Sequence, residues 1–465
     1  MSSMAPATLG LTGAAAAGPR CRGVHRPLLA LLVLIPLGLY ACTIGRYGDA
    51  FSSADGHLYY LHAHSWYFDG DCDYANNLRL DPKLRARDYY LAQRSVRGQA
   101  LNVFPCGWSV IALPSLALAD LMTVVHNSVA GSSLPRDGFS AYYRAVVPLG
   151  HVLLGIAGLL VSYRFTCRYF SQTIAAAATL LVLLGTSVIY FVSFEPTMSH
   201  AGSFALVAMM VATTDVIFWK GWTLWRAVGL GVSMGLATAL RHQDIVWAAV
   251  PVVLLGPSLI GRKSTVAPGD TPVPAGPGSS WGYAATAAGA AILCLVPQVL
   301  VNLSIHGRVA SDQGFFTPDW SQPRIVRTLF SHPSGLLVLF PLVAVSLIGL
   351  LGLLRQRSTR RLAMALLIGF GALLYLNACG RTGCSRRFVS GEVAWVLGLA
   401  GILQWARSAS GWAVVAGVLV GGVCLRNLVL VGLVFAGHVA PGLFNAWMTQ
   451  GPRIIHHLAG LLPFR

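Results

Sequence analysis

The chain alternates between long apolar stretches and short polar ones. Apolar runs of roughly 17 to 22 residues recur along its length, and each can cross about 30 Å of hydrocarbon as a helix. This pattern predicts an all-α polytopic membrane protein with about eleven transmembrane helices. The runs lie near 27–44, 144–162, 173–193, 201–219, 226–240, 244–259, 282–302, 335–354, 362–378, 390–406 and 411–434.

Basic residues between the runs predict the orientation. Arg20, Arg22 and Arg26 precede the first run, and a dense basic segment occupies 355–361. Because loops rich in Lys and Arg remain in the cytoplasm, we expect a cytoplasmic N-terminus. The polar segments that then face outward together are 45–103, 195–200, 303–334 and 377–388.

The segment near 104–125 is apolar but does not fit as a crossing. If the loop at 45–103 is outside and Arg164 is inside, an odd number of crossings separates them, and the run at 144–162 supplies one. The segment at 104–125 also contains two prolines and a glycine. We therefore expect a juxtamembrane or re-entrant element, which is tolerated where protein or a watery cavity covers it.

The composition narrows the class of protein. Hydrophobic residues make up 55% of the chain and charged residues 11%, whereas soluble proteins carry about 25% charge. The formal net charge is +17, yet no basic helix or arm stands apart from the spans, so nucleic-acid binding is not expected. Two explanations of the charge remain open: basic cytoplasmic loops, and outward arginines that hold a phosphate-bearing lipid.

The loop behind the first run concentrates the carboxylates. Of 16 acidic residues in the chain, seven lie between positions 49 and 88. Asp55 is suited to accept a proton from a hydroxyl nucleophile at the membrane surface, with Gly56 allowing a tight turn; a helix-capping Asp is the plainer alternative. Asp71 and Asp73 either bind a divalent cation or form turns, and both readings remain open.

Further polar residues lie at the outward ends of other runs. Glu195 precedes Pro196, and an ionisable group at such a boundary is either functional or an interfacial cap. Arg241, Arg386 and Arg387 run against the positive-inside bias. Guanidinium groups bind phosphate through paired hydrogen bonds, so these residues are candidates to stabilise a lipid-linked phosphate leaving group.

The order of these motifs resembles that of a known enzyme class. The motifs are Asp-Gly-x-x-Tyr-Tyr at 55–60, Phe-Asp-Gly-Asp-x-Asp-Tyr at 68–74, Glu-Pro-x-x-Ser-His at 195–200 and Gly-Cys-Ser-Arg-Arg-Phe at 383–388. Together they resemble bacterial membrane glycosyltransferases of the GT-C class, which include protein-mannosyltransferase-like and lipopolysaccharide sugar transferases. The resemblance covers nearly the whole chain past residue 27.

The resemblance implies a GT-C-like bundle and an inverting sugar transfer from a polyprenyl-phosphate donor. It assigns Asp55 as the first-loop catalytic carboxylate and Glu195 as the second-loop acid, where the class commonly has Asp. It assigns Arg241 as the basic residue near the donor phosphate. The expected substrate-binding residues are His57, Tyr59, His200, Arg241, Arg386 and Arg387.

The expected location is the cytoplasmic (inner) membrane, with the active site on its periplasmic or extracellular side. The expected partners are a polyprenyl-phosphate-linked sugar, membrane lipid, and a glycolipid, polysaccharide or protein acceptor. The only cofactor considered is a divalent cation. Residues 1–26 are expected to form a disordered cytoplasmic tail, 27–434 the transmembrane catalytic domain, and 435–465 a short amphipathic segment. The alternatives are a flippase for lipid-linked sugar or polysaccharide and a noncatalytic membrane subunit.

Overall fold

The computed structural model describes residues 26–408, apart from 52, 82–83, 85–91, 93, 261–276, 310–318, 332–334 and 381–384, and a few isolated positions beyond 408. The expected N-terminal tail before Arg26, most of the expected span at 411–434 and the segment 435–465 lie outside the described residues. Within the described part the chain forms helices, turns and one isolated bridge between Arg94 and Ala100.

Seven helical segments of the described part are long and apolar enough to cross a membrane. They contain α1 (Arg26–Tyr47), α5 (Gly107–Ala130), α6 with α7 (Ala141–Val146 and Leu149–Thr166), α10 (His200–Lys220), α13 (Pro277–His306), α17 (Arg360–Cys379) and α18 (Glu392–Ser408). Shorter apolar helices are α8 (Gln172–Gly185), α11 (Leu224–Leu240) and α16 (Pro341–Leu353). The predicted all-α polytopic fold is confirmed.

Short helical segments connect these long ones. They are α2 (Ala54–His64), the π-helical turn η1 (Ser65–Asp69), α3 (Ala75–Leu80), α9 (Val188–Ser193), η2 (His242–Ala248), α12 (Ala249–Leu259), α14 (Ile325–Phe330), α15 (Leu336–Leu339) and η3 (Ser385–Gly391). Some of the expected spans are therefore divided between two helical segments. The run at 173–193 breaks between α8 and α9, and the run at 335–354 breaks where Pro341 begins α16, a position that proline favours.

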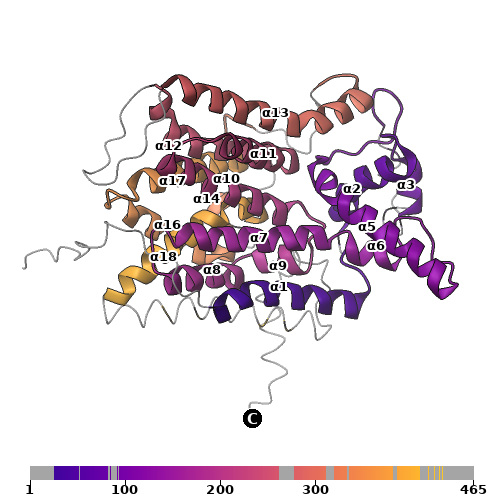
Figure 1. Cartoon of the computed structure of the whole chain (residues 1–465), viewed down its shortest axis with the longest axis horizontal. Helices are drawn as coiled ribbons and strands as arrows, with labels where there is room; N and C mark the ends of the chain where they lie inside the picture. Colours follow the sequence, from indigo (N-terminus) through magenta and orange to yellow (C-terminus); the bar gives the residue numbers. More distant parts are fainter. Residues whose placement is uncertain are drawn as a thin grey trace, which may run out of the picture.

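The segment expected as a juxtamembrane or re-entrant element is α5. It is a single uninterrupted helix of 24 residues despite Pro114. Figure 1 shows α5 grouped with α2, α3 and α6 at one end of the bundle. Helix α5 packs against α2 and α6, which makes it part of the framework that holds α2.

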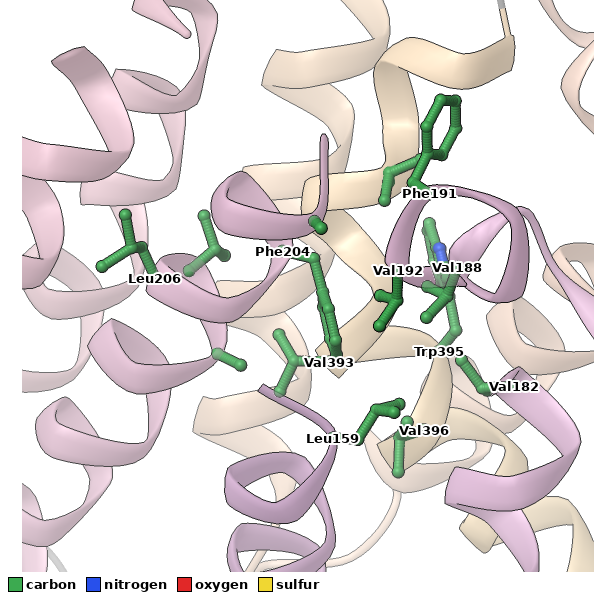
Figure 2. Packing of buried hydrophobic residues seen from close by; sticks show 14 of the residues in the cluster. Leu159, Val182, Val188, Phe191, Val192, Phe204, Leu206, Val393, Trp395 and Val396 are labelled. Atoms are coloured by element: carbon green, nitrogen blue, oxygen red, sulfur yellow. The ribbon is translucent and has the colours of Figure 1, made fainter. Parts of the chain in front are cut away.

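The core of the bundle lies where α10 and α18 meet α7, α8 and α9 (Figure 2). Leu159, Phe204 and Trp395 are almost completely buried there and interlock with valines of α9 and α18. Close packing of this kind leaves little freedom for the helix ends. The starts of α10 and α18 consequently have defined positions relative to each other.

Small residues bring α11 against α13. Gly231 and Gly235 lie one turn apart, and a Cβ added at Gly231 would approach the carbonyl oxygen of Ala287 at 2.1 Å. Membrane helices use such small residues to approach closely, since lipid gives no hydrophobic force between them. This contact secures α11, whose last residue leads into Arg241.

Candidate active site

Helix α2 presents Asp55 in its first turn. The helix begins after its N-cap residue Ser53, whose side-chain oxygen accepts a hydrogen bond from the amide of Gly56 at 3.1 Å. This bond satisfies one of the backbone amides that have no partner within the first turn of a helix. A carboxylate in the first turn interacts favourably with the helix dipole. The Asp55 side chain is 31% exposed, and its Oδ2 lies 3.3 Å from Nη2 of Arg386. An accessible carboxylate therefore sits beside a guanidinium group.

Gly56 docks α2 onto the loop that carries Glu195. A Cβ at Gly56 would lie 2.3 Å from Oγ1 of Thr197, and the indole of Trp108 donates to the carbonyl of Pro196 at 3.2 Å. Gly56 is helical and is absent from the positive-φ glycines of the described residues. The expected tight turn at Gly56 is therefore wrong, because the residue is needed for close packing.

The acid of this loop is buried and oriented. Glu195 is 4% exposed, and the hydroxyl of Tyr190 donates to its Oε2 at 2.8 Å. His200 follows at the start of α10, and its ring stacks on Phe191 with centroids 4.1 Å apart. These contacts give the two predicted side chains defined positions in the interior.

Tyr59 joins the two segments. It lies one turn after Asp55, so both share a face of α2, and its hydroxyl accepts a hydrogen bond from Ser199 at 3.0 Å. Burial raises the pKa of Tyr59, an effect opposed chiefly by the positive charge of Arg241. The phenol therefore stays protonated and keeps a hydrogen to donate.

Three arginines complete the arrangement. Arg241 ends α11, is 8% exposed, and its Nη1 has no hydrogen-bond partner among the described residues. Arg386 and Arg387 lie in η3. The charges of all three act on His200, and those of Arg241 and Arg386 act on Tyr59. Seven of the predicted residues thus gather at one place: Asp55, Tyr59, Glu195, His200, Arg241, Arg386 and Arg387.

His57 lies apart from them. Its Nδ1 is 2.5 Å from Oδ2 of Asp81 and its Nε2 is 3.2 Å from the carbonyl oxygen of Phe51. Two residues along a helix correspond to about 200°, so His57 faces away from the side shared by Asp55 and Tyr59. Both ring nitrogens are engaged in the interior, so the structure gives no support for the predicted substrate-binding role of His57.

Asp71 and Asp73 serve as local acceptors. Oδ1 of Asp71 accepts from Ser65 at 2.8 Å, and Oδ1 of Asp73 accepts from the amides of Ala75 and Ala100. Within the described part of the chain, no three His, Cys, Asp or Glu side chains are grouped to hold a metal ion. The structure thus favours the turn-forming alternative for these two residues.

Sequence reasoning overlooked the side chains that support the site. Tyr190 orients Glu195, and Asp244, only 2% exposed, accepts a hydrogen bond from Ser203. Asp244 closes the short polar segment 241–244 between two apolar runs, and an ionisable residue at such a boundary is a signal that could have identified it. Tyr190 carried no such signal, since an aromatic residue in a membrane helix is common.

No protein-family model matches the chain, and no curated protein matches it. Among solved structures it is similar to apo ArnT from Cupriavidus metallidurans, at 15% identity and a TM-score of 0.50, covering 92% of this chain and 75% of that one. ArnT bound to undecaprenyl phosphate matches with a TM-score of 0.48 at 14% identity, over 92% of this chain and 76% of that one.

The archaeal oligosaccharyltransferase AglB from Archaeoglobus fulgidus, in complex with an inhibitory peptide and a dolichol-phosphate, also matches. Its TM-score is 0.45 at 14% identity, over 92% of this chain and 56% of that one. The similarity to apo ArnT extends over nearly the whole described chain and shows a shared fold. The predicted GT-C-like fold is confirmed.

Proposed function

We propose that this chain is a glycosyltransferase of the cytoplasmic membrane that moves a sugar from a polyprenyl-phosphate donor to a cell-envelope acceptor. Its active site faces the periplasmic or extracellular side. The acceptor is a glycolipid, a polysaccharide or a protein. The observation that carries this proposal is the pairing of the accessible Asp55 carboxylate with Arg386 at 3.3 Å, next to the buried Arg241.

The pairing matches what sugar transfer from a phosphate requires. The reaction needs a base for the attacking hydroxyl and positive charge for the departing phosphate. Asp55 supplies the first, and the Nη1 of Arg241, which has no partner among the described residues, has hydrogen-bonding capacity for the second. Burying a guanidinium group with unpaired donors costs free energy. Such a group is expected in a site that binds an anion, because the anion then accepts from those donors.

The proposed mechanism is a single displacement that inverts the anomeric centre. Asp55 accepts the proton of the acceptor hydroxyl while that oxygen forms a bond to the anomeric carbon. The bond between the anomeric carbon and the phosphate oxygen breaks, and its electron pair leaves with the polyprenyl phosphate. Arg241 and Arg387 neutralise the phosphate charge as it develops.

The remaining gathered side chains orient the reactants. Glu195 is fixed by Tyr190 and accepts a hydrogen bond from the acceptor, which sets the direction of attack. Tyr59 keeps its phenolic hydrogen and donates it to the bound substrate. His200, stacked on Phe191, hydrogen-bonds the phosphate oxygens between the arginines.

Transfer from radiolabelled polyprenyl-phosphate sugars tests the proposal, with purified full-length protein in proteoliposomes and envelope acceptors. We expect Asp55→Asn to lower transfer by about 10²-fold or more, because the base is lost. Asp137→Asn is the matched control, since Oδ1 of Asp137 accepts from the amides of Phe139 and Ser140, and it should retain transfer.

Undiminished transfer by Asp55→Asn would exclude Asp55 as the base. Wild-type protein that translocates a lipid-linked sugar across the vesicle membrane, yet transfers none of the donors, would instead establish the flippase alternative. Transfer by the wild type and not by Asp55→Asn supports the enzyme.

A further inference from the structure

The turn η2 lies between the segments that carry the arginines. Arg241 is extended at the end of α11, with φ −149° and ψ 107°, and the amide of Asp244 donates to its carbonyl at 2.8 Å. The Asp244 side chain is buried and accepts a hydrogen bond from Ser203 of α10. The hydroxyl of Ser390, in η3, also stabilises this carboxylate. One side chain thus connects three elements of the site.

Neighbouring bonds strengthen the same connection. The amide of Gln243 donates to the carbonyl oxygen of Arg387 at 2.8 Å, and the indole of Trp247 donates to Oγ of Ser390 at 3.1 Å. Since Ser390 accepts from Trp247, its own hydrogen remains for Asp244. Gln243 and Trp247 of η2 therefore attach η3 to the segment that follows Arg241.

A buried carboxylate is a costly way to connect helices. Burying an ionised carboxylate away from water is unfavourable unless hydrogen bonds and an opposite charge offset it. Here the hydroxyls of Ser203 and Ser390 and the charge of Arg241 reduce that cost, while Oδ1 of Asp244 has no hydrogen-bond partner among the described residues. Apolar side chains would pack this junction with less penalty, so the carboxylate points to a requirement beyond stability.

We propose that Asp244 is a positioning residue that sets the spacing between Arg241 and the arginine pair of η3. Arginine side chains are long, and two guanidinium groups converge on one phosphate only if their backbones are held at a fixed separation. A misplacement of about 1 Å costs about 10²-fold in a reaction that depends on orientation. The identity of the anion as a polyprenyl phosphate rests on the proposed function.

The first test is binding of polyprenyl monophosphate to purified full-length protein. We expect Asp244→Ala to weaken binding by about tenfold or more, and Asp244→Asn by less, because its amide oxygen still accepts from Ser203. Asp215→Asn is the matched control: Asp215 is also a buried carboxylate, on α10 like Ser203 but near the other end of that helix, and it pairs with Arg168 at 2.8 Å. It should lose stability and keep its affinity.

A second readout needs no lipid ligand. Arg241 is 8% exposed, so phenylglyoxal should modify it slowly in the wild type and in Asp215→Asn. Modification should be faster in Asp244→Ala, as followed by peptide mass spectrometry. Arg241 that stays equally protected in Asp244→Ala overturns the positioning role, as does an equal loss of affinity in Asp215→Asn.

The two readouts separate the failure of this inference from that of the proposed function. If the wild type binds no polyprenyl monophosphate, the proposed donor is wrong, and the arginine modification alone decides the role of Asp244. If the wild type binds the lipid and Asp244→Ala binds it equally well, the positioning role is wrong and the donor class stands.

Discussion

The close approach of Gly56 to Thr197 allows a sharp test of how α2 is held. Replacing a helical glycine by alanine ordinarily stabilises a protein by about 0.5–1 kcal/mol, because the unfolded chain loses freedom. At Gly56 the new methyl group would lie 2.3 Å from Oγ1 and 2.8 Å from Cβ of Thr197. We therefore expect Gly56→Ala to destabilise the protein.

The magnitude follows from these distances. Ordinary contacts of a Cβ lie at 3.4–4 Å, so α2 and the loop at Thr197 must separate by about 1 Å, and overpacking of this kind costs about 1–3 kcal/mol. The displaced turn carries Asp55. A shift of about 1 Å at a reacting group lowers the rate by about 10²-fold. We therefore expect a large loss of transfer activity together with only a modest fall in melting temperature.

Thermal unfolding and transfer assays in the same preparation measure both effects. Thr197→Gly removes both contacting atoms and should restore Gly56→Ala, whereas Thr197→Ala leaves the Cβ and should restore it only in part. Gly229→Ala is the control, because a Cβ there meets nothing within 4 Å. Gly56→Ala behaving like Gly229→Ala would refute the reasoning, as would a failure of Thr197→Gly to rescue.

Three further predictions concern single contacts. Tyr190→Phe removes the hydrogen bond to Glu195 and should lower the transfer rate by about tenfold with unchanged donor affinity; an unchanged rate would contradict the orienting role. Burial lowers the pKa of His62 to about 4, against a hydrogen bond to Phe104 that raises it, so the folded state excludes a proton that the unfolded state binds. The free energy of unfolding should therefore fall as the pH drops from 6.5 towards 4, and at pH 5 it should be about 2 kcal/mol below its value at neutral pH. The free energy of unfolding of His62→Gln should depend less on pH, and an equal pH dependence in wild type and variant would contradict this prediction. Arg386→Lys should bind polyprenyl monophosphate more weakly than wild type and more tightly than Arg386→Ala, because ammonium keeps the charge without the paired donors; equal affinities would exclude a phosphate contact.

Much of the site was predictable because charges are scarce in this chain. Asp55, Glu195 and Arg241 each stand at the boundary of an apolar run, where an ionisable side chain needs a reason. Their boundaries all belong to the same predicted side of the membrane. Hydrophobic pattern and loop charge were therefore enough to expect that these distant residues meet, and they do.

The contacts within the site were not predictable in the same way. His57 and Tyr59 are two positions apart and equally suited to a sugar, but only the docked helix shows that one faces Asp81 and the other Ser199. The motif likewise gave no sign that Gly56 packs closely against Thr197, a residue far away in the sequence. Such pairings depend on tertiary packing, which local residue patterns do not encode.

The same limit applies to helix boundaries. Ten of the eleven expected runs coincide with helical segments of the described part, but only seven segments there are long enough to span, and one of these, α5, was not expected as a span. The breaks at Thr186 and Phe340 fall inside continuous hydrophobic stretches. A helix that is apolar on all sides has no periodicity to mark its end. The uninterrupted α5 shows the converse, since Pro114 suggested a break that the surrounding helices do not require.

The pairing of Asp55 with Arg386 also bears on biosynthesis. Asp55 leaves the ribosome well before Arg386, because most of the described helices lie between the two residues in the sequence. The two charges therefore meet late, and we expect a chain arrested before η3 to be inert however well its earlier helices have entered the bilayer. If the proposed function holds, activity requires the finished chain, and a half-inserted molecule should not consume the lipid carrier.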